Sequence, residues 1–131
     1  MAGLSLAIGI LTADMLNSLD PQIKPLLKWP NDIYVNNQKL GGILIDLIAE
    51  ANGNCRVIIG VGLNVNMKDS MLEGVDQPWT SLEHLLNVKL DRNVVVAQLI
   101  NAVAKGMDVF VEKGMEPFLT TWKRYDLLEN K

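Results

Sequence analysis

The sequence has one cysteine and no cluster of basic residues. Cys55 cannot form a disulfide within the chain, and one thiol is too few for a cysteine-based metal site. A small buried thiol in a reducing compartment is therefore favoured over a reactive nucleophile. The 12 basic residues are outnumbered by 15 acidic ones, and the net charge is −3. This balance gives no electrostatic footprint for nucleic-acid binding.

The chain also lacks a long apolar run with a basic start. Residues 1–11 are apolar, but no Lys or Arg precedes them, and Asp14 interrupts the run. A bilayer-spanning helix needs about 20 apolar residues, and a signal peptide opens with positive charge. The N-terminal stretch thus predicts a core helix of a cytoplasmic protein, with no membrane partner.

Apolar residues make up 49% of the 131 residues and charged residues 21%, which favours one folded domain or part of one. A helix is predicted over 4–19, where apolar residues recur every three or four positions, and Asp20-Pro21 ends it. Strands are predicted at 25–29, 33–35, 39–48 and 57–64, with turns at 36–38 and 51–54. These strands form an antiparallel meander.

Helices follow an irregular loop over 67–78. The first is short, with Thr80 as its cap and Glu83 three places on. The second runs from a cap at Asp91 to Gly114, and the last covers about 116–127, with Pro117 in its first turn. The predicted fold class is α+β, an antiparallel or mixed sheet packed on helices. The buried stripe of the long helix is expected to contain Val96, Leu99, Ile100, Val103, Met107 and Phe110.

Glycines gather on one side of the predicted strand 57–64, in the segment VIIGVGLNVN. Because side chains alternate along a strand, its odd-numbered residues give an apolar face and its even-numbered ones a bare face. A bare face lets a flat ligand approach the backbone, but glycines in strands equally mark bulges or a close helix crossing. The candidate residues are Gly41 and Gly42 on one strand, and Gly60, Gly62, Asn64 and Asn66 along the next.

Charged residues stand beside these glycines in KWPNDIYVNNQKLGGILID, residues 28–46. Lys39 begins the strand that carries Gly41 and Gly42, where an ammonium group would attract a carboxylate or a phosphate. Asn31 and Asp32 are consistent with a simple turn, or with an acceptor for a ribose or a hydrated Mg²⁺. The residues alone predict a sheet-face site for a flat, anionic, nucleotide-like ligand.

The segments KWPNDIYVNNQKLGGILID and VIIGVGLNVN resemble the central motifs of biotin–protein ligases, at matching spacing. GLSLAIGI and PFLTTWKRYDLLENK resemble flanking segments of the same family, so the resemblance covers nearly the whole chain. It implies a biotin/lipoate ligase-like, class II synthetase-like catalytic domain. It also implies formation of biotinyl-5′-adenylate from biotin and ATP with Mg²⁺, then transfer of biotin to a lysine of a carboxylase's biotin carboxyl carrier domain.

Site roles follow from the same resemblance. Lys39 falls on the catalytic lysine that contacts the biotin carboxylate and the α-phosphate, and Lys28 on a second lysine near the phosphates. Asn31 and Asp32 fall near the adenylate, with Asp32 reaching Mg²⁺ through water. The remaining positions are Gly42 on the strand against biotin and Asn64 at the adenine.

Two parts of the family pattern are not found in residues 1–131. These are the upstream glycine- and arginine-rich loop that closes over biotin and phosphate, and the small β-barrel that follows the catalytic domain. The chain is expected to be a partial catalytic domain, inactive or weakly active alone, and prone to self-association as a homodimer. Two alternatives remain: a relative of lipoate–protein ligases, and a non-catalytic adenylate-binding or oligomerisation module of the same fold.

Overall fold

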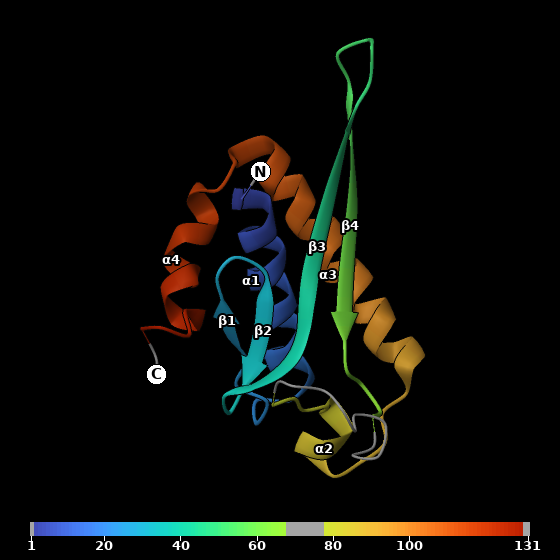
Figure 1. Ribbon diagram of the computed structural model, residues 1–131, viewed down its shortest axis with the longest axis vertical. Coiled ribbons are helices and arrows are strands. Elements are labelled where there is room, and N and C mark those ends of the chain that lie inside the picture. The colour runs from blue at the N-terminus through green and yellow to red at the C-terminus, as the bar shows by residue number, and fades with distance from the viewer. Residues whose placement is uncertain (1, 68–77, 130–131) are drawn as a thin grey trace.

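The protein folds into one antiparallel sheet packed on helices, which confirms the predicted α+β class. A computed structural model describes residues 2–67 and 78–129 (Figure 1). In chain order, the elements are α1 (Ala2–Leu19), β1 (Leu26–Lys28), β2 (Asp32–Val35), β3 (Gln38–Ala49), β4 (Cys55–Leu63), α2 (Leu82–Leu86), α3 (Arg92–Lys113) and α4 (Glu116–Tyr125).

The four strands lie in the order β1-β2-β3-β4, and each pairs antiparallel with the next. The predicted turn between β2 and β3 forms on Asn36 and Asn37, whose φ angles are 52° and 61°. Asparagine tolerates this left-handed region better than most residues, which explains the tight hairpin. The Trp29–Pro30 peptide bond is cis and lies between β1 and β2.

The core lies between the sheet and α1. The predicted stripe of α1 is confirmed, because Leu4, Ile8 and Met15 are buried against strand residues such as Ile33. Helices α3 and α4 pack on α1 in turn. Near its C-terminus, α4 contributes Tyr125, whose hydroxyl donates to Oδ1 of Asp14 and accepts from Nδ2 of Asn17 at 3.1 Å. One face of the sheet is therefore packed on helices.

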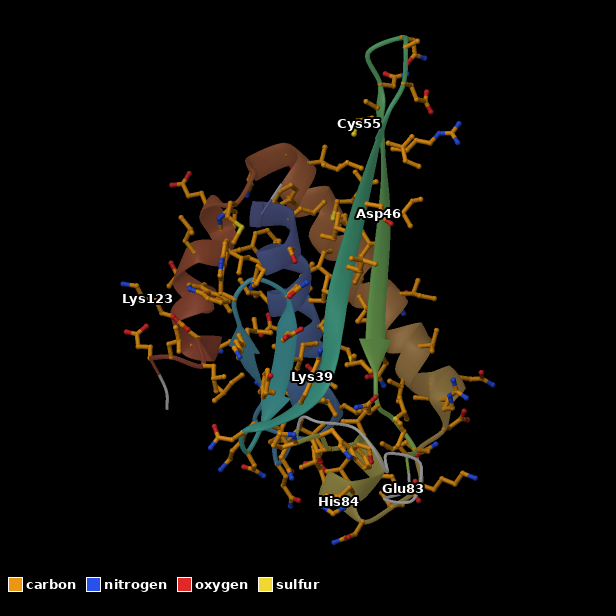
Figure 2. All side chains as sticks on the ribbon, viewed as in Figure 1. Lys39, Asp46, Cys55, Glu83, His84 and Lys123 are labelled. Atoms are coloured by element: carbon orange, nitrogen blue, oxygen red, sulfur yellow. The ribbon has the colours of Figure 1, made fainter. Side chains whose placement is uncertain are left out.

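Two sequence predictions need correction here. Ser81, not Thr80, caps α2: its side chain accepts from the His84 N–H at 3.1 Å, whereas the buried Thr80 hydroxyl has no partner among the described residues. Cys55 is exposed rather than buried, because it lies near the end of the β3–β4 hairpin (Figure 2). Most of the predicted loop over 67–78 lies outside the described residues.

The predicted buried stripe of α3 is also partly wrong. Val96 and Ile100 are 50% and 61% exposed, whereas Val95 and Gly106 are buried instead. Gly106 marks the closest approach to α1, since a Cβ atom there would lie 2.2 Å from Cδ1 of Leu11. Helix α3 is thus held on one side only.

Helix α3 is the one described helix long and apolar enough to cross a membrane, judged by length and composition. The core helices of soluble proteins meet the same criterion, so this is weak support for a membrane span. Its mean hydropathy is 1.6, and most of it is exposed. Much of the apolar surface of α3 is left uncovered by the described residues.

Candidate active site

The sheet face that carries the glycines holds an open hollow of about 490 Å³. Its lining comes from β2, β3, β4 and the turn before β2. The lining residues are Asn31, Asp32, Lys39, Gly42, Ile43, Leu44, Gly60, Val61 and Gly62. Six of these nine positions were site candidates from the sequence, and the fold brings them together from three strands.

The floor of the hollow is bare backbone. Gly42 pairs with Gly62 across β3 and β4, and Leu44 pairs with Gly60. A Cβ atom added to Gly60 would lie 3.5 Å from the nearest atom, and one added to Gly62 would lie 4.0 Å away. Both are ordinary contacts, so protein packing does not demand glycine at either position. A floor left open without a packing reason favours the ligand explanation of these glycines.

Gly41 has the structural explanation instead. A Cβ atom there would lie 2.1 Å from the backbone oxygen of Gly62, which no side chain could tolerate. Gly41 does not line the hollow, and it lies beside a register shift of the β2–β3 ladder between Ile33 and Tyr34. The close approach of two strands therefore accounts for this glycine.

Lys39 and Asp32 form the charged end of the hollow. Nζ of Lys39 lies 3.4 Å from Oδ1 of Asp32, and their side chains are 37% and 29% exposed. The Lys39 backbone is fixed on both sides: its N–H donates to Pro78 O, and its C=O accepts from Thr80 N, each at 2.9 Å. Figure 2 shows Lys39 on β3 beside β2. A half-exposed ammonium on a fixed backbone is well placed to meet an anionic ligand.

Two other candidates have contacts away from the lining. The Lys28 ammonium lies 5.6 Å from the centre of the Tyr34 ring, a cation–π contact, and Lys28 does not line the hollow. Asn66 bonds the backbone of Leu90 through both its amide nitrogen and its oxygen, at 2.7 and 2.9 Å. Asn66 therefore acts as a structural clamp.

Asn31 lines the hollow, whereas Asn64 lies just beyond the end of β4 and is not among the lining residues. The carbonyl of Asn31 accepts from the N–H of Ile43 at 2.7 Å. Nδ2 of Asn64 donates to Thr80 O at 3.1 Å, and within the described residues no protein donor bonds its Oδ1. That oxygen is the group of Asn64 with which a ligand donor could bond.

Sequence reasoning missed the lining residues Ile43, Leu44 and Val61, and also the segment 78–80. Leu44 shares a strand face with Gly42, so the same alternation that selected Gly60 and Gly62 could have found it. The pairing of 78–80 with Lys39 joins segments that are distant in sequence. No pattern among neighbouring residues could have predicted this contact.

The donor set for a metal is small. Within residues 2–67 and 78–129, no group of three or more His, Cys, Asp or Glu side chains could hold a metal ion. Asp32 is the one carboxylate that lines the hollow. A single carboxylate suits Mg²⁺ that arrives with phosphates and keeps several waters, rather than a resident metal.

Comparison with known proteins finds similar chains. Residues 4–64 match the description "Biotin/lipoate A/B protein ligase family". The bifunctional ligase/repressor BirA of Escherichia coli is 36% identical over 129 residues, which are 98% of this chain. The chain is similar to members of the biotin/lipoate A/B protein ligase family. The similarity therefore extends over both the sequence and the fold.

Two further relatives are similar. The biotin–[acetyl-CoA-carboxylase] ligase of Mycobacterium tuberculosis is 37% identical over 99 residues, 74% of this chain and 34% of the relative. The biotin protein ligase of Aquifex aeolicus, solved with biotin and ATP, superposes with a TM-score of 0.84 and 26% identity, covering 97% of this chain and 52% of that one. The chain spans 40% of the E. coli relative.

Proposed function

We propose that residues 1–131 form the second half of a biotin–protein ligase catalytic domain. Its substrates would be biotin, ATP with Mg²⁺, and a lysine on the biotin carboxyl carrier domain of a carboxylase, in the cytoplasm. The single observation that carries the proposal is the Lys39–Asp32 pair at the end of a glycine floor. Similarity to this ligase family supports the same assignment.

In the first step, a biotin carboxylate oxygen attacks the α-phosphorus of ATP. A new P–O bond forms, the bond to the β-phosphate oxygen breaks, and pyrophosphate leaves. Lys39 would bring the two anions together and offset the charge that builds on the α-phosphoryl oxygens. Its half-exposed position leaves the ammonium accessible to both reactants.

In the second step, the acceptor lysine's neutral amine attacks the acyl carbonyl of the adenylate. The amide bond forms, the bond from carbonyl carbon to phosphate oxygen breaks, AMP leaves and the amine loses a proton. The adenylate would lie over Gly42, Gly60 and Gly62, whose lack of side chains permits close contact. Its flat base and its extended acyl chain suit such a floor.

The other residues would orient the nucleotide. Oδ1 of Asn64 would accept from the adenine amino group, and Lys28 would attract the outer phosphates. Asp32, next to Asn31, would hold a hydrated Mg²⁺ that accompanies ATP and offsets phosphate charge. Asp32 also lies 3.4 Å from the Lys39 ammonium, which links the two charged groups of the site.

Calorimetric titration with a non-hydrolysable biotinyl-adenylate analogue tests the proposal directly. The chain should release heat on binding, and Lys39→Ala should lose it. Free biotin, titrated beside it, reports how much of the binding the adenylate half provides. A folded chain that binds no analogue would refute the site as an adenylate-binding surface in these 131 residues.

A second candidate is a non-catalytic adenylate-binding module of the same fold. It is favoured by the open hollow. Biotin-dependent exchange of pyrophosphate into ATP separates the two candidates, because binding without exchange identifies the module. A lipoyl-adenylate analogue that binds more tightly than the biotinyl one would favour the lipoate branch of the family.

A further inference from the structure

The turn between β1 and β2, residues 29–31, leads directly into the charged end of the hollow. Asn31, in this turn, and Asp32, just after it, both line the hollow. A Cβ atom added to Gly42 would lie 3.3 Å from Oδ1 of Asp32 and 3.8 Å from Cε of Lys39. Both charged side chains therefore lie beside the bare backbone of this glycine. A small shift of the turn would move the Asp32 carboxylate relative to the Lys39 ammonium.

Two hydrogen bonds hold consecutive carbonyl groups of the turn. The Asn31 carbonyl accepts from the N–H of Ile43 on β3 at 2.7 Å. The Pro30 carbonyl accepts from the Ser5 hydroxyl on α1 at 3.2 Å. In Figure 1, the turn joins β1 to β2 and lies against the N-terminal half of α1. Ser5 does not line the hollow, so its route to a bound ligand runs through this turn.

Helix α1 lies close to the turn because Gly9 follows Ser5 by one helical turn. Residues four apart share a face of a helix, so Gly9 faces the same strands as Ser5. A Cβ atom at Gly9 would lie 3.4 Å from side-chain atoms of both Leu27 on β1 and Ile43 on β3. The cavity left between α1 and the turn measures about 10 Å³, room for no more than about one water. With so little free volume, the position of α1 constrains the position of the turn.

We infer that Ser5 is a positioning residue for Asp32. Its hydroxyl holds the Pro30 carbonyl and thereby fixes the turn that directs the Asp32 carboxylate toward Lys39. The inference rests on the proposed function, in which Asp32 holds a hydrated Mg²⁺ beside the phosphates of the nucleotide. A charged group that is already fixed needs little reorientation when a ligand binds. A fixed Asp32 should therefore favour binding of the nucleotide with Mg²⁺ over binding of the nucleotide alone.

A purely structural role for Ser5 makes a different prediction. Alanine has a higher helix propensity than serine, and the Ser5 hydrogen bond is exposed to solvent. In Ser5→Ala, the gain in propensity should offset the lost bond, so the urea midpoint of unfolding should stay close to that of the parent. A loss of ligand affinity in a variant of unchanged stability is then a loss of geometry.

Calorimetric titration with a non-hydrolysable ATP analogue tests the inference. With Mg²⁺ present, Ser5→Ala should weaken binding by about 2- to 10-fold, the effect of one lost hydrogen bond of ordinary strength. In EDTA, the same variant should bind like the parent. Ser5→Thr keeps the hydroxyl and should retain the affinity of the parent. Ser18→Ala removes the other serine of α1, which is exposed and faces α3, and it should have no effect.

A double-mutant cycle shows whether Ser5 acts through Asp32. In an Asp32→Asn background, Ser5→Ala should cause no further loss of affinity, because the charged group that Ser5 positions is gone. An equal loss in both backgrounds would overturn the inference. The inference also fails if Ser5→Ala weakens binding as much in EDTA as with Mg²⁺, or if Ser5→Thr binds no better than Ser5→Ala.

Hydrogen exchange of the Ile43 amide, measured by NMR without ligand, separates this inference from the proposed function. The Ile43 N–H bonds to the turn that Ser5 holds. Ser5→Ala should therefore speed its exchange by about threefold or more through local opening, and Ser18→Ala should not. Faster exchange in a chain that binds no nucleotide would refute the proposed function and leave the positioning role standing. An Ile43 amide that Ser5→Ala does not affect would overturn the inference, whatever the chain binds.

Discussion

Lys39 and Gly42 stand three residues apart on β3 and yet face the same side of the sheet. A regular strand would turn them to opposite faces. The β2–β3 ladder pairs Tyr34 with Lys39 and Ile33 with Gly41, so Leu40 is an extra residue in β3. This bulge turns the Lys39 ammonium onto the glycine face, where Asp32 meets it at 3.4 Å.

The positive charge of Lys39 should contribute strongly to the affinity for the adenylate. Replacing it with alanine removes a charge-assisted contact, which is worth about 1.5–3 kcal/mol, or roughly 10- to 100-fold in affinity. Lys105→Ala is the matched control, because this exposed lysine lies on α3 and does not line the hollow. Calorimetry on both variants measures the difference. Equal losses would show that only net charge matters.

The glycines should divide into two classes. Gly60→Ala and Gly62→Ala should leave the free energy of unfolding within about 1 kcal/mol of the parent, because neither new Cβ atom would clash. They should nevertheless weaken adenylate binding, since each methyl group lifts the ligand from the floor. Gly41→Ala should instead destabilise the fold by about 1–3 kcal/mol through overlap with Gly62 O. Urea unfolding and calorimetry together check this division.

Tyr125 should make stability depend on alkaline pH. Burial raises the pKa of its hydroxyl above 10.0, and the hydrogen bond to Asp14 raises it further. A raised pKa means that the folded state holds the proton more tightly, so this contribution is complete below pH 10 and is lost as pH rises through the folded value. The Tyr125→Phe variant has no hydroxyl to titrate, so its stability should not show this fall at alkaline pH. Unfolding measured from pH 8 to 11 in both proteins isolates it, and parallel curves would contradict it.

The start of α2 offers a matched pair of hydroxyl deletions. Ser81→Ala removes the cap that accepts from His84 N and should destabilise the protein by about 1 kcal/mol. Thr80→Val removes a buried hydroxyl with no partner among the described residues, so it should be neutral or stabilising. Thermal unfolding of the two variants compares them. A larger loss in Thr80→Val would mean that its hydroxyl has a partner.

The elements that sequence predicted well are those set by local chemistry. The stripe of α1 follows from helical spacing, and the β2–β3 turn follows from Asn36 and Asn37, which tolerate positive φ. Asp91 caps α3 as predicted, accepting from the N–H of Asn93. Each of these features depends on residues that are close together in the sequence.

The failures depend on tertiary contacts. Helix α3 is apolar around much of its circumference, so periodicity could not decide which side meets α1, and Gly106 decided it. Thr80 and Ser81 are both hydroxyl residues just before α2. Which of them caps the helix depends on where α2 begins in the folded structure. At the site, alternation found Gly60 and Gly62, but the bulge that turns Lys39 toward them leaves no mark in the local sequence.

The bond from Leu127 to Leu27 joins positions 100 residues apart. During synthesis on the ribosome, β1 therefore emerges long before the residues that cover its edge. Until Leu127 emerges, the Leu27 carbonyl at the β1 edge lacks this partner, and chains on neighbouring ribosomes can pair there. Chaperone capture at that stage would protect the growing chain, and truncation just before Leu127 would make the exposed β1 edge permanent.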